Sequence, residues 1–234
     1  MKQVYLCLSF ILCFSPVLAC NKAENHALCE EGRGSSAKSI FRHPFYAGAI
    51  GGYGSTTWQG LVPREENSNI ALSISTPVKA EEGGGVWGLF LGYELSPFFA
   101  IEANYIHYPS AIVTFDEFSL FSFSNDNLTS FDSQTQTANI MGKVMLFLPY
   151  TNIRLYSSAG VAEIFRNDML LTATKYTPTF GAGLNYRLNE VLMLEIAGNY
   201  TAGFGESQLN PAETFFPFLY SVMAKVALCF GSRY

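Results

Sequence analysis

Long apolar runs, charged residues, histidines and paired cysteines are all scarce in this 234-residue sequence. The longest apolar run covers residues 4–14. A helix that spans a bilayer needs about 20 such residues, so a helical membrane bundle is excluded. Charged residues make up 14% of the chain, against about 25% in ordinary soluble domains. The net charge of -5 disfavours nucleic acid as a partner.

The scarcity of histidine and cysteine limits the chemistry of the chain. The cysteines lack the paired spacing of zinc sites, so we expect no metal and no cofactor. Of the three histidines, only His107 has both a serine and an acid nearby, Ser110 and Asp116. A lipid-modifying enzyme would need such a group. The simpler interpretation is that His107 lies in a loop or among the aromatic residues at a membrane interface. We therefore expect a protein without enzymatic activity.

The first 19 residues have the pattern of a secretory signal peptide, with Lys2 before the apolar run and a small-residue cleavage site. Cleavage after Ala19 would leave Cys20 to form a disulfide with Cys29 in an oxidising periplasm. The segment that ends at Cys20 also resembles a lipobox, in which this cysteine is lipidated. Both alternatives stay open. Residues 20–44 are polar and predict a periplasmic tail.

Apolar and aromatic residues, by contrast, are abundant and recur at every second position. Hydrophobic residues make up 49% of the chain, with 20 Phe, 13 Tyr and 20 Gly, which excludes strong disorder. Successive side chains of a strand point to opposite faces, so this period predicts strands. Eight segments show it: residues 45–53, 86–95, 99–106, 138–148, 153–161, 180–188, 192–200 and 220–230.

The two faces of these segments differ in charge. One face has no Asp, Glu, Lys or Arg, as expected in lipid, where a charge at the midplane costs about 2–4 kcal/mol. A soluble β-sandwich would instead turn its apolar face inward. We therefore predict an all-β fold, an eight-stranded antiparallel transmembrane β-barrel over residues 45–231, with a tail at 232–234. The inward face carries Glu94, Glu102, Lys143, Arg154, Arg187, Glu195 and Lys225.

The connections between the segments alternate in length. Three of them have two to four residues, and the four at the other end are long. Short periplasmic turns and long external loops are typical of outer-membrane barrels. We therefore expect the outer membrane of a Gram-negative bacterium, periplasmic termini, and outer-membrane lipid and lipopolysaccharide as partners of the wall. The long connections are residues 56–85, 108–136, 165–178 and 201–218.

Three motifs resemble the outer membrane protein A family of eight-stranded barrels. They are Phe45-Tyr46-Ala47-Gly48-Ala49, Gly92-Tyr93-Glu94-Leu95-Ser96-Pro97 followed by Ile101-Glu102, and Phe180-Gly181-Ala182-Gly183-Leu184-Asn185-Tyr186. The resemblance covers about residues 45–231. It implies that the outer-membrane assembly machinery recognises the closing strand, which ends in Phe230. Family members often carry a periplasmic peptidoglycan-binding domain after the barrel, and residues 231–234 lead us to expect none here.

Four of the interior charges lie at similar heights when residues are counted from the short turns. Glu102 and Lys143 are on neighbouring strands, and so are Glu195 and Lys225. The resemblance implies a salt-bridge plug, with Glu102 and Lys143 at its positions. Stability alone can explain these charges, because buried charges must pair. Alternatively, they form the gate of a narrow pore for small solutes. A second group, nearer the periplasm, consists of Glu94, Arg154 and Arg187.

The long connections are where specific recognition would reside, because barrels of this kind carry function in their loops. Acidic residues outnumber basic ones there, which argues against heparin-like or phosphate-rich partners. We expect exposed aromatic residues to anchor a host or surface protein partner. Alternatively, residues 118–124 extend the barrel strands. The sequence thus predicts a structural or adhesin-like role, with Phe115, Phe118, Phe121, Phe123, Phe215 and Phe216 as the interaction candidates.

Overall fold

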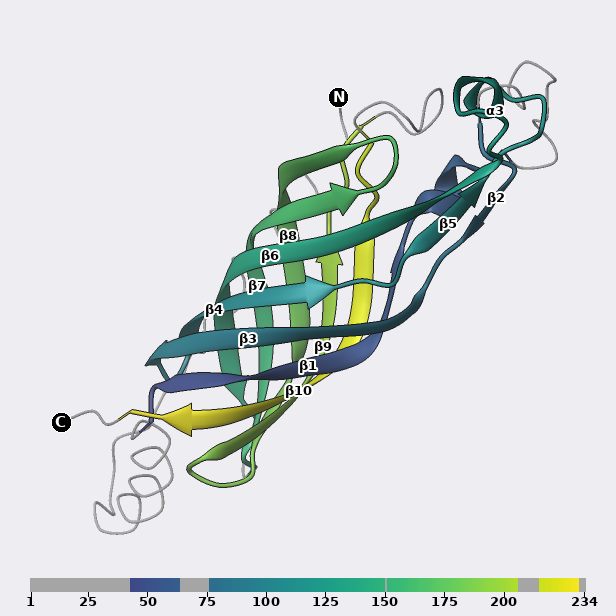
Figure 1. Cartoon of the computed structure of the whole chain (residues 1–234). Helices are drawn as coiled ribbons and strands as arrows, with labels where there is room; N and C mark the ends of the chain where they lie inside the picture. The colour runs from purple at the N-terminus through teal and green to yellow at the C-terminus, as the bar shows by residue number, and fades with distance from the viewer. Residues whose placement is uncertain (1–42, 64–75, 150, 206–214, 232–234) are drawn as a thin grey trace, which may run out of the picture. The chain divides into compact units, whose positions relative to one another are not determined.

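A computed structural model describes residues 43–63, 76–149, 151–205 and 215–231. Within them, eight strands form a closed antiparallel barrel (Figure 1), which confirms the predicted fold class. The expected signal peptide, Cys20 and Cys29 lie outside the described residues. The barrel strands are β1 (Phe45–Thr56), β3 (Gly84–Ser96), β4 (Phe99–His107), β6 (Ser130–Phe147), β7 (Ile153–Asn167), β8 (Thr172–Arg187), β9 (Leu192–Thr201) and β10 (Leu219–Phe230).

The barrel closes because its first and last strands pair. β1 and β10 are in register from Phe45 with Phe230 to Thr56 with Leu219. Each of the other barrel strands pairs with the barrel strands before and after it in the chain, including β6 with β7. Every barrel strand therefore has a partner on both sides, which satisfies backbone hydrogen bonds that lipid cannot.

Side chains alternate between the lumen and the outer wall along each strand. Leu91 on the outer wall is 63% exposed, whereas Glu102 in the lumen is fully buried. Aromatic side chains on three neighbouring strands meet at the end with the short turns. There the ring of Phe45 lies 4.7 Å from that of Tyr93 and 6.0 Å from that of Phe230, measured between centroids. The burial pattern of each strand follows the phase predicted from the sequence.

Three strands are longer than the sequence predicts. β6 begins at Ser130, β7 ends at Asn167 and β8 begins at Thr172. The expected long connection over residues 165–178 is therefore wrong, because the connection between β7 and β8 covers only residues 168–171. The hydrogen-bonded ladder continues past the lipid layer, where outward side chains meet water and need not be apolar. An apolar outer face therefore marks the lipid layer and not the strand ends.

Four connections lie at the end of the barrel opposite the short turns. Loop one is residues 57–83, loop two 108–129, loop three 168–171 and loop four 202–218. Among the described residues, no helix is long and apolar enough to cross a membrane. The short elements of the loops are η2 (Trp58–Leu61), β2 (Lys79–Glu81), β5 (Ala111–Thr114) and α3 (Leu120–Ser124).

Loop two combines a strand extension with a helical turn. β5 pairs with the upper part of β6, and β2 pairs with β5, so a small sheet continues β6 beyond the barrel (Figure 1). Residues 118–124 do not extend a strand, and that alternative is wrong. They include α3, because the Ser119 side chain accepts a hydrogen bond from the Ser122 amide and begins a helical turn.

Glycines in the lumen make room for large side chains. Tyr46 on β1 and Gly92 on β3 are register partners, and the Tyr46 ring covers the α-carbon of Gly92. A methyl group at Gly92 would overlap this ring. At Gly51, on the outer face of β1, an added methyl group would have no heavy atom within 4 Å.

We expect Gly92→Ala to destabilise the barrel by about 1–3 kcal/mol, the usual cost of overpacking. Displacement of the Tyr46 ring also weakens the hydrogen bond from its hydroxyl to Glu102. Urea unfolding in detergent micelles measures the change. Gly51→Ala is the matched control and should leave stability unchanged. Equal stability of the two variants would contradict the proposed packing.

Candidate functional site

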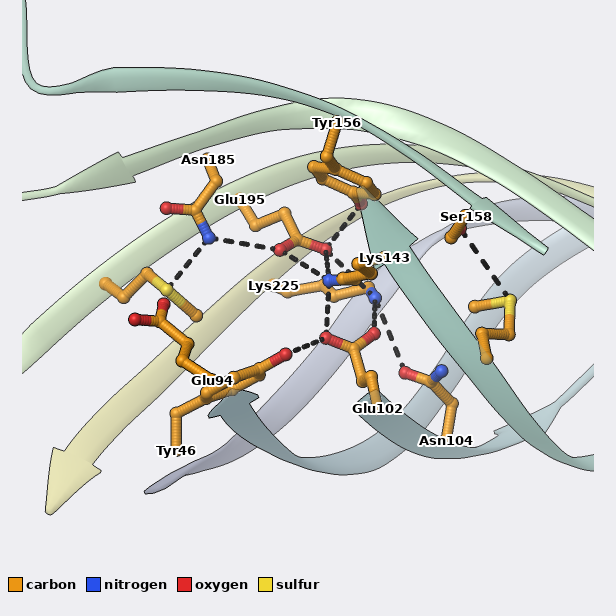
Figure 2. Close-up of polar contacts among 12 residues, drawn as sticks. Tyr46, Glu94, Glu102, Asn104, Lys143, Tyr156, Ser158, Asn185, Glu195 and Lys225 are labelled. Atoms are coloured by element: carbon orange, nitrogen blue, oxygen red, sulfur yellow. Dashed lines mark hydrogen bonds and ion pairs between the residues drawn. The ribbon is translucent and has the colours of Figure 1, made fainter. Parts of the chain in front are cut away.

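Two lysines and two glutamates form a closed network in the middle of the lumen (Figure 2). Lys143 on β6 contacts both Glu102 and Glu195, with a nitrogen–oxygen distance of 2.9 Å to Glu195. Lys225 on β10 contacts the same two carboxylates, at 2.7 Å from Glu102 and 3.0 Å from Glu195. Each glutamate is therefore shared by both lysines. The sequence placed these residues at one height but did not predict this four-membered arrangement.

Two tyrosines and two asparagines complete the network. The Tyr46 hydroxyl donates to Glu102 at 3.0 Å, and the Tyr156 hydroxyl donates to Glu195 at 2.6 Å. The ammonium group of Lys143 also lies 4.3 Å from the centre of the Tyr156 ring. These partners were missed in the sequence, although their inward phase could have indicated them. The asparagines are Asn185, which donates to Glu195, and Asn104, which accepts from Lys225.

A second ionic group lies nearer the short turns. Glu94 on β3 accepts from Arg154 at 2.6 Å and from Arg187 at 3.1 Å, so one carboxylate oxygen is shared by two guanidinium groups. All three side chains are buried. Together the two groups place paired charges across the middle of the lumen and its short-turn side, in a barrel whose interior is just wide enough for its own side chains.

His107, the histidine considered as a catalytic candidate, lies at the end of β4 beside an aromatic ring. Its ring lies 5.3 Å from that of Trp87, between centroids. Within the described ranges, no hydrogen bond joins His107 to a hydroxyl or carboxylate. The same part of the chain also holds no group of three or more histidines, cysteines or acids that could bind a metal ion.

Most of the aromatic residues predicted to be exposed in the loops are buried instead. The predicted exposure is wrong for Phe115, Phe121, Phe215 and Phe216, which are at most 9% exposed, whereas Phe118 is 75% and Phe123 67% exposed. The rings of Phe115, Phe121 and Phe215 pack together because loops one, two and four meet above the barrel, whereas Phe216 packs in the core of the barrel. This loop core consists of Trp58, Leu61, Ala111, Val113, Phe115, Phe121, Phe131 and Phe215.

Close ring contacts hold the loop core together. The rings of Phe115 and Phe121 are stacked at 4.2 Å, and those of Trp58 and Phe215 meet at 5.0 Å. Arg166, from the upper end of β7, places its guanidinium 4.7 Å from the Trp58 ring and donates to the carbonyl of Phe215. The arginine also pairs with Asp168 at 2.6 Å. Loops one, three and four are thereby fastened to each other.

Glu82, in loop one, fixes the start of η2. Its carboxylate accepts hydrogen bonds from the amide of Trp58 at 2.6 Å, the amide of Gln59 at 3.3 Å and the hydroxyl of Thr56 at 3.2 Å. Partial burial raises the pKa of the Glu82 carboxyl, and the three hydrogen bonds oppose this effect without cancelling it. Its neighbour Glu81 is exposed, and the pKa of its carboxyl is lowered by the hydrogen bond from Lys79.

Residues 42–233 match the OmpA-like transmembrane domain. The chain belongs to this family. It is therefore a β-barrel protein of the bacterial outer membrane. Members of the family are mostly structural and surface proteins without enzymatic activity. No curated protein matches the sequence.

Solved structures of other outer-membrane proteins are similar to this chain at low sequence identity. OprG from Pseudomonas aeruginosa is 10% identical, with a TM-score of 0.50, and the match covers 83% of this chain and 99% of OprG. Neisserial surface protein A is 12% identical, with a TM-score of 0.48 and coverages of 80% and 97%. Ail from Yersinia pestis is 12% identical, with a TM-score of 0.39 and coverages of 80% and 99%. The likeness to OprG agrees with the barrel fold.

Lys143→Ala should lower the free energy of unfolding by about 3–5 kcal/mol, because it leaves buried carboxylates without one of their two cations. Urea unfolding in micelles measures the loss. Lys79→Ala is the control, since it removes an exposed lysine that pairs with Glu81 and should leave stability almost unchanged. An unchanged stability of Lys143→Ala would refute the role of the network in stability.

A pH titration should distinguish Glu82 from Glu81. The folded loop binds a proton on Glu82 more tightly than the unfolded chain does, because its pKa is raised. Loop one is therefore most stable below the ordinary glutamate pKa and loses that contribution as the pH rises through the raised pKa. The Trp58 amide resonance should report this transition by NMR. Glu82→Gln should abolish the transition, and a midpoint for Glu82 below that of Glu81 would contradict the assignment.

Proposed function

We propose that this protein is a surface protein that binds another protein through the exposed end of loop two, in a structural or adhesin-like role. The observation that carries the proposal is a cluster of large apolar side chains that remain exposed although the loop core beneath them is buried. We call this cluster the loop-two tip. Its members are Phe118, Leu120, Phe123 and Leu128, which are 75%, 61%, 67% and 51% exposed.

The loop-two tip is held in place by its own hydrogen bonds and by the loop core. Asp116 accepts from the Phe118 amide at 2.9 Å, and the Ser119 hydroxyl accepts from the Ser122 amide at 3.2 Å. Phe121, in the same short helix, is anchored against Phe115 and Phe131. A surface that is ordered before binding has less conformational entropy to lose, so exposed apolar side chains on it favour a binding role.

Charge indicates the chemistry of the partner. The acidic residues Asp116, Glu117 and Asp126 lie beside the apolar side chains in the sequence of loop two, and residues 115–129 contain no lysine or arginine. A partner protein with an apolar pocket rimmed by basic side chains would complement this surface. Nucleic acids and other phosphate-rich partners are disfavoured by the same charges.

The remainder of the barrel supports further parts of the proposal. The exposed apolar wall would contact outer-membrane lipid and lipopolysaccharide, and the short turns would face the periplasm, as is usual for such barrels. β10 ends at the aromatic residue Phe230, which would be read by the outer-membrane assembly machinery. These contacts would give the protein a part in envelope integrity even without a loop partner.

Binding through the loop-two tip should be lost in the double variant Phe118→Ser with Phe123→Ser. A phage-displayed peptide library, panned against the refolded full chain in nanodiscs, should enrich peptides that combine apolar with basic residues. The double variant should bind these peptides at least about tenfold more weakly, as expected when central apolar anchors are removed. Met169→Ser, an exposed apolar residue of loop three, is the control. Equal binding by the double variant, or enrichment of acidic peptides, would contradict the proposal.

A narrow pore is the second candidate function, and buried hydroxyl groups favour it. Thr135, Thr137 and Thr177 are buried at the long-loop side of the lumen, and within the described residues their hydroxyls have no hydrogen-bond partner. Such groups favour bound water. In this proposal, the network around Lys143 is the gate, and Lys143→Ala should conduct small ions in planar bilayers. Recordings without channel events, in both this variant and the natural protein, would remove the candidate.

A further inference from the structure

A groove of about 670 Å³ lies on the outer wall of the barrel. It crosses β1, β3, β4, β6, β7 and β8, and several of these strands lie side by side in Figure 1. The wall of a barrel is otherwise convex, and this concavity is independent of the loop-two tip and of the lumen. Its floor is formed by small side chains, those of Ala47, Ala103 and Ala138.

The groove follows two adjacent rows of register partners. One row runs across the strands through Ala47, Leu91, Ala103, Ile140 and Val161. It takes four steps between neighbouring strands, and with strands about 4.8 Å apart this row is about 19 Å long. This exceeds the acyl layer of one leaflet, about 15 Å. The groove is therefore long enough for one extended fatty acyl chain.

The second row leads to a charged residue. It runs through Leu89, Tyr105, Ala138, Glu163 and Tyr176. Glu163 is the first charged residue on the outer face of β7 counted from the short turn, and Tyr176 on β8 is its register partner. Ten residues of a tilted strand rise about 25 Å, which is the height of the apolar band. Glu163 therefore lies where lipid head groups begin.

The apolar lining and the single charge of the groove favour a lipid as its occupant. Its lining is almost entirely apolar, and the strands on either side belong to the lipid-covered wall, so the groove is continuous with the lipid interface. Glu163 is the one charged side chain among the residues of the two rows. A carboxylate at the head-group level attracts a cation and repels an additional anion.

We propose that this groove is a lipid-binding site, which takes one acyl chain along its floor and an ammonium-bearing head group beside Glu163. The alanines leave the space that the chain fills, and the large side chains of Leu91 and Ile140, which alternate with the alanines in the first row, pack against it. A lipid in the groove loses contact with other lipids and gains contact with the wall on several sides. Lipids elsewhere on the wall meet a convex surface and exchange freely.

Native mass spectrometry of the full chain tests this site. The refolded barrel is equilibrated in micelles that contain equal amounts of phosphatidylethanolamine and phosphatidylglycerol with identical acyl chains. We expect one phosphatidylethanolamine to be retained per barrel, in about fivefold preference, as for one partly exposed ion pair. Ala103→Phe fills the groove and should abolish retention, and Glu163→Gln should bring the ratio of the two lipids close to one.

A matched control separates the groove from the general wall. Ala224→Phe makes the same change on the outer face of β10, between Gly51 and Ile196 and away from the groove. It should retain the lipid as the natural protein does. Heat-modifiable gel mobility verifies that each variant is folded. Retention by Ala103→Phe, loss in Ala224→Phe, or equal retention of both lipids by the natural protein would each overturn the proposal.

Discussion

The closure of the backbone hydrogen-bond ladder is the constraint on which the rest of this structure depends. Hydrocarbon offers no partner for an unpaired amide or carbonyl, so the sheet must return to its first strand. Pairing of β1 with β10 makes that closure. With eight strands, the ring is so narrow that each inward side chain faces side chains from across the lumen. Burial of the interior, and the pairing of its charges, follow from this width.

The network of Lys143, Lys225, Glu102 and Glu195 is a consequence of that narrow interior. Charges taken out of water are costly unless each has a well-placed partner, and sharing both carboxylates between both lysines meets this requirement. Glycines opposite the tyrosines, as at Gly92, supply the space in which the hydroxyls reach the carboxylates. At the level of this network, the lumen is thus filled by the barrel's own side chains.

The loops follow a different rule from the wall. In water, aromatic side chains are stabilised by burial against each other, and Trp58, Phe121 and Phe215 accordingly form a core of their own above the barrel. This core leaves Phe118 and Phe123 outside. On the wall, the outward side chains are covered by lipid, and the shape of the surface then decides whether a lipid is bound or merely adjacent. The groove at Ala103 is such a shape.

The sequence by itself determined the membrane-spanning parts of the eight strands, their inward and outward faces and the closed barrel, because alternation is local and has a period of two residues. It also identified the interior charges, since a charge on a lipid-facing position is too costly. Only the tertiary structure decided which charges meet, since contacts such as Lys225 with Glu102 cross the lumen and depend on closure and register. It alone decided which loop aromatics are buried, as with Phe115, and where the wall is hollow. Those features arise from segments far apart in the chain, where no periodic pattern relates one residue to another.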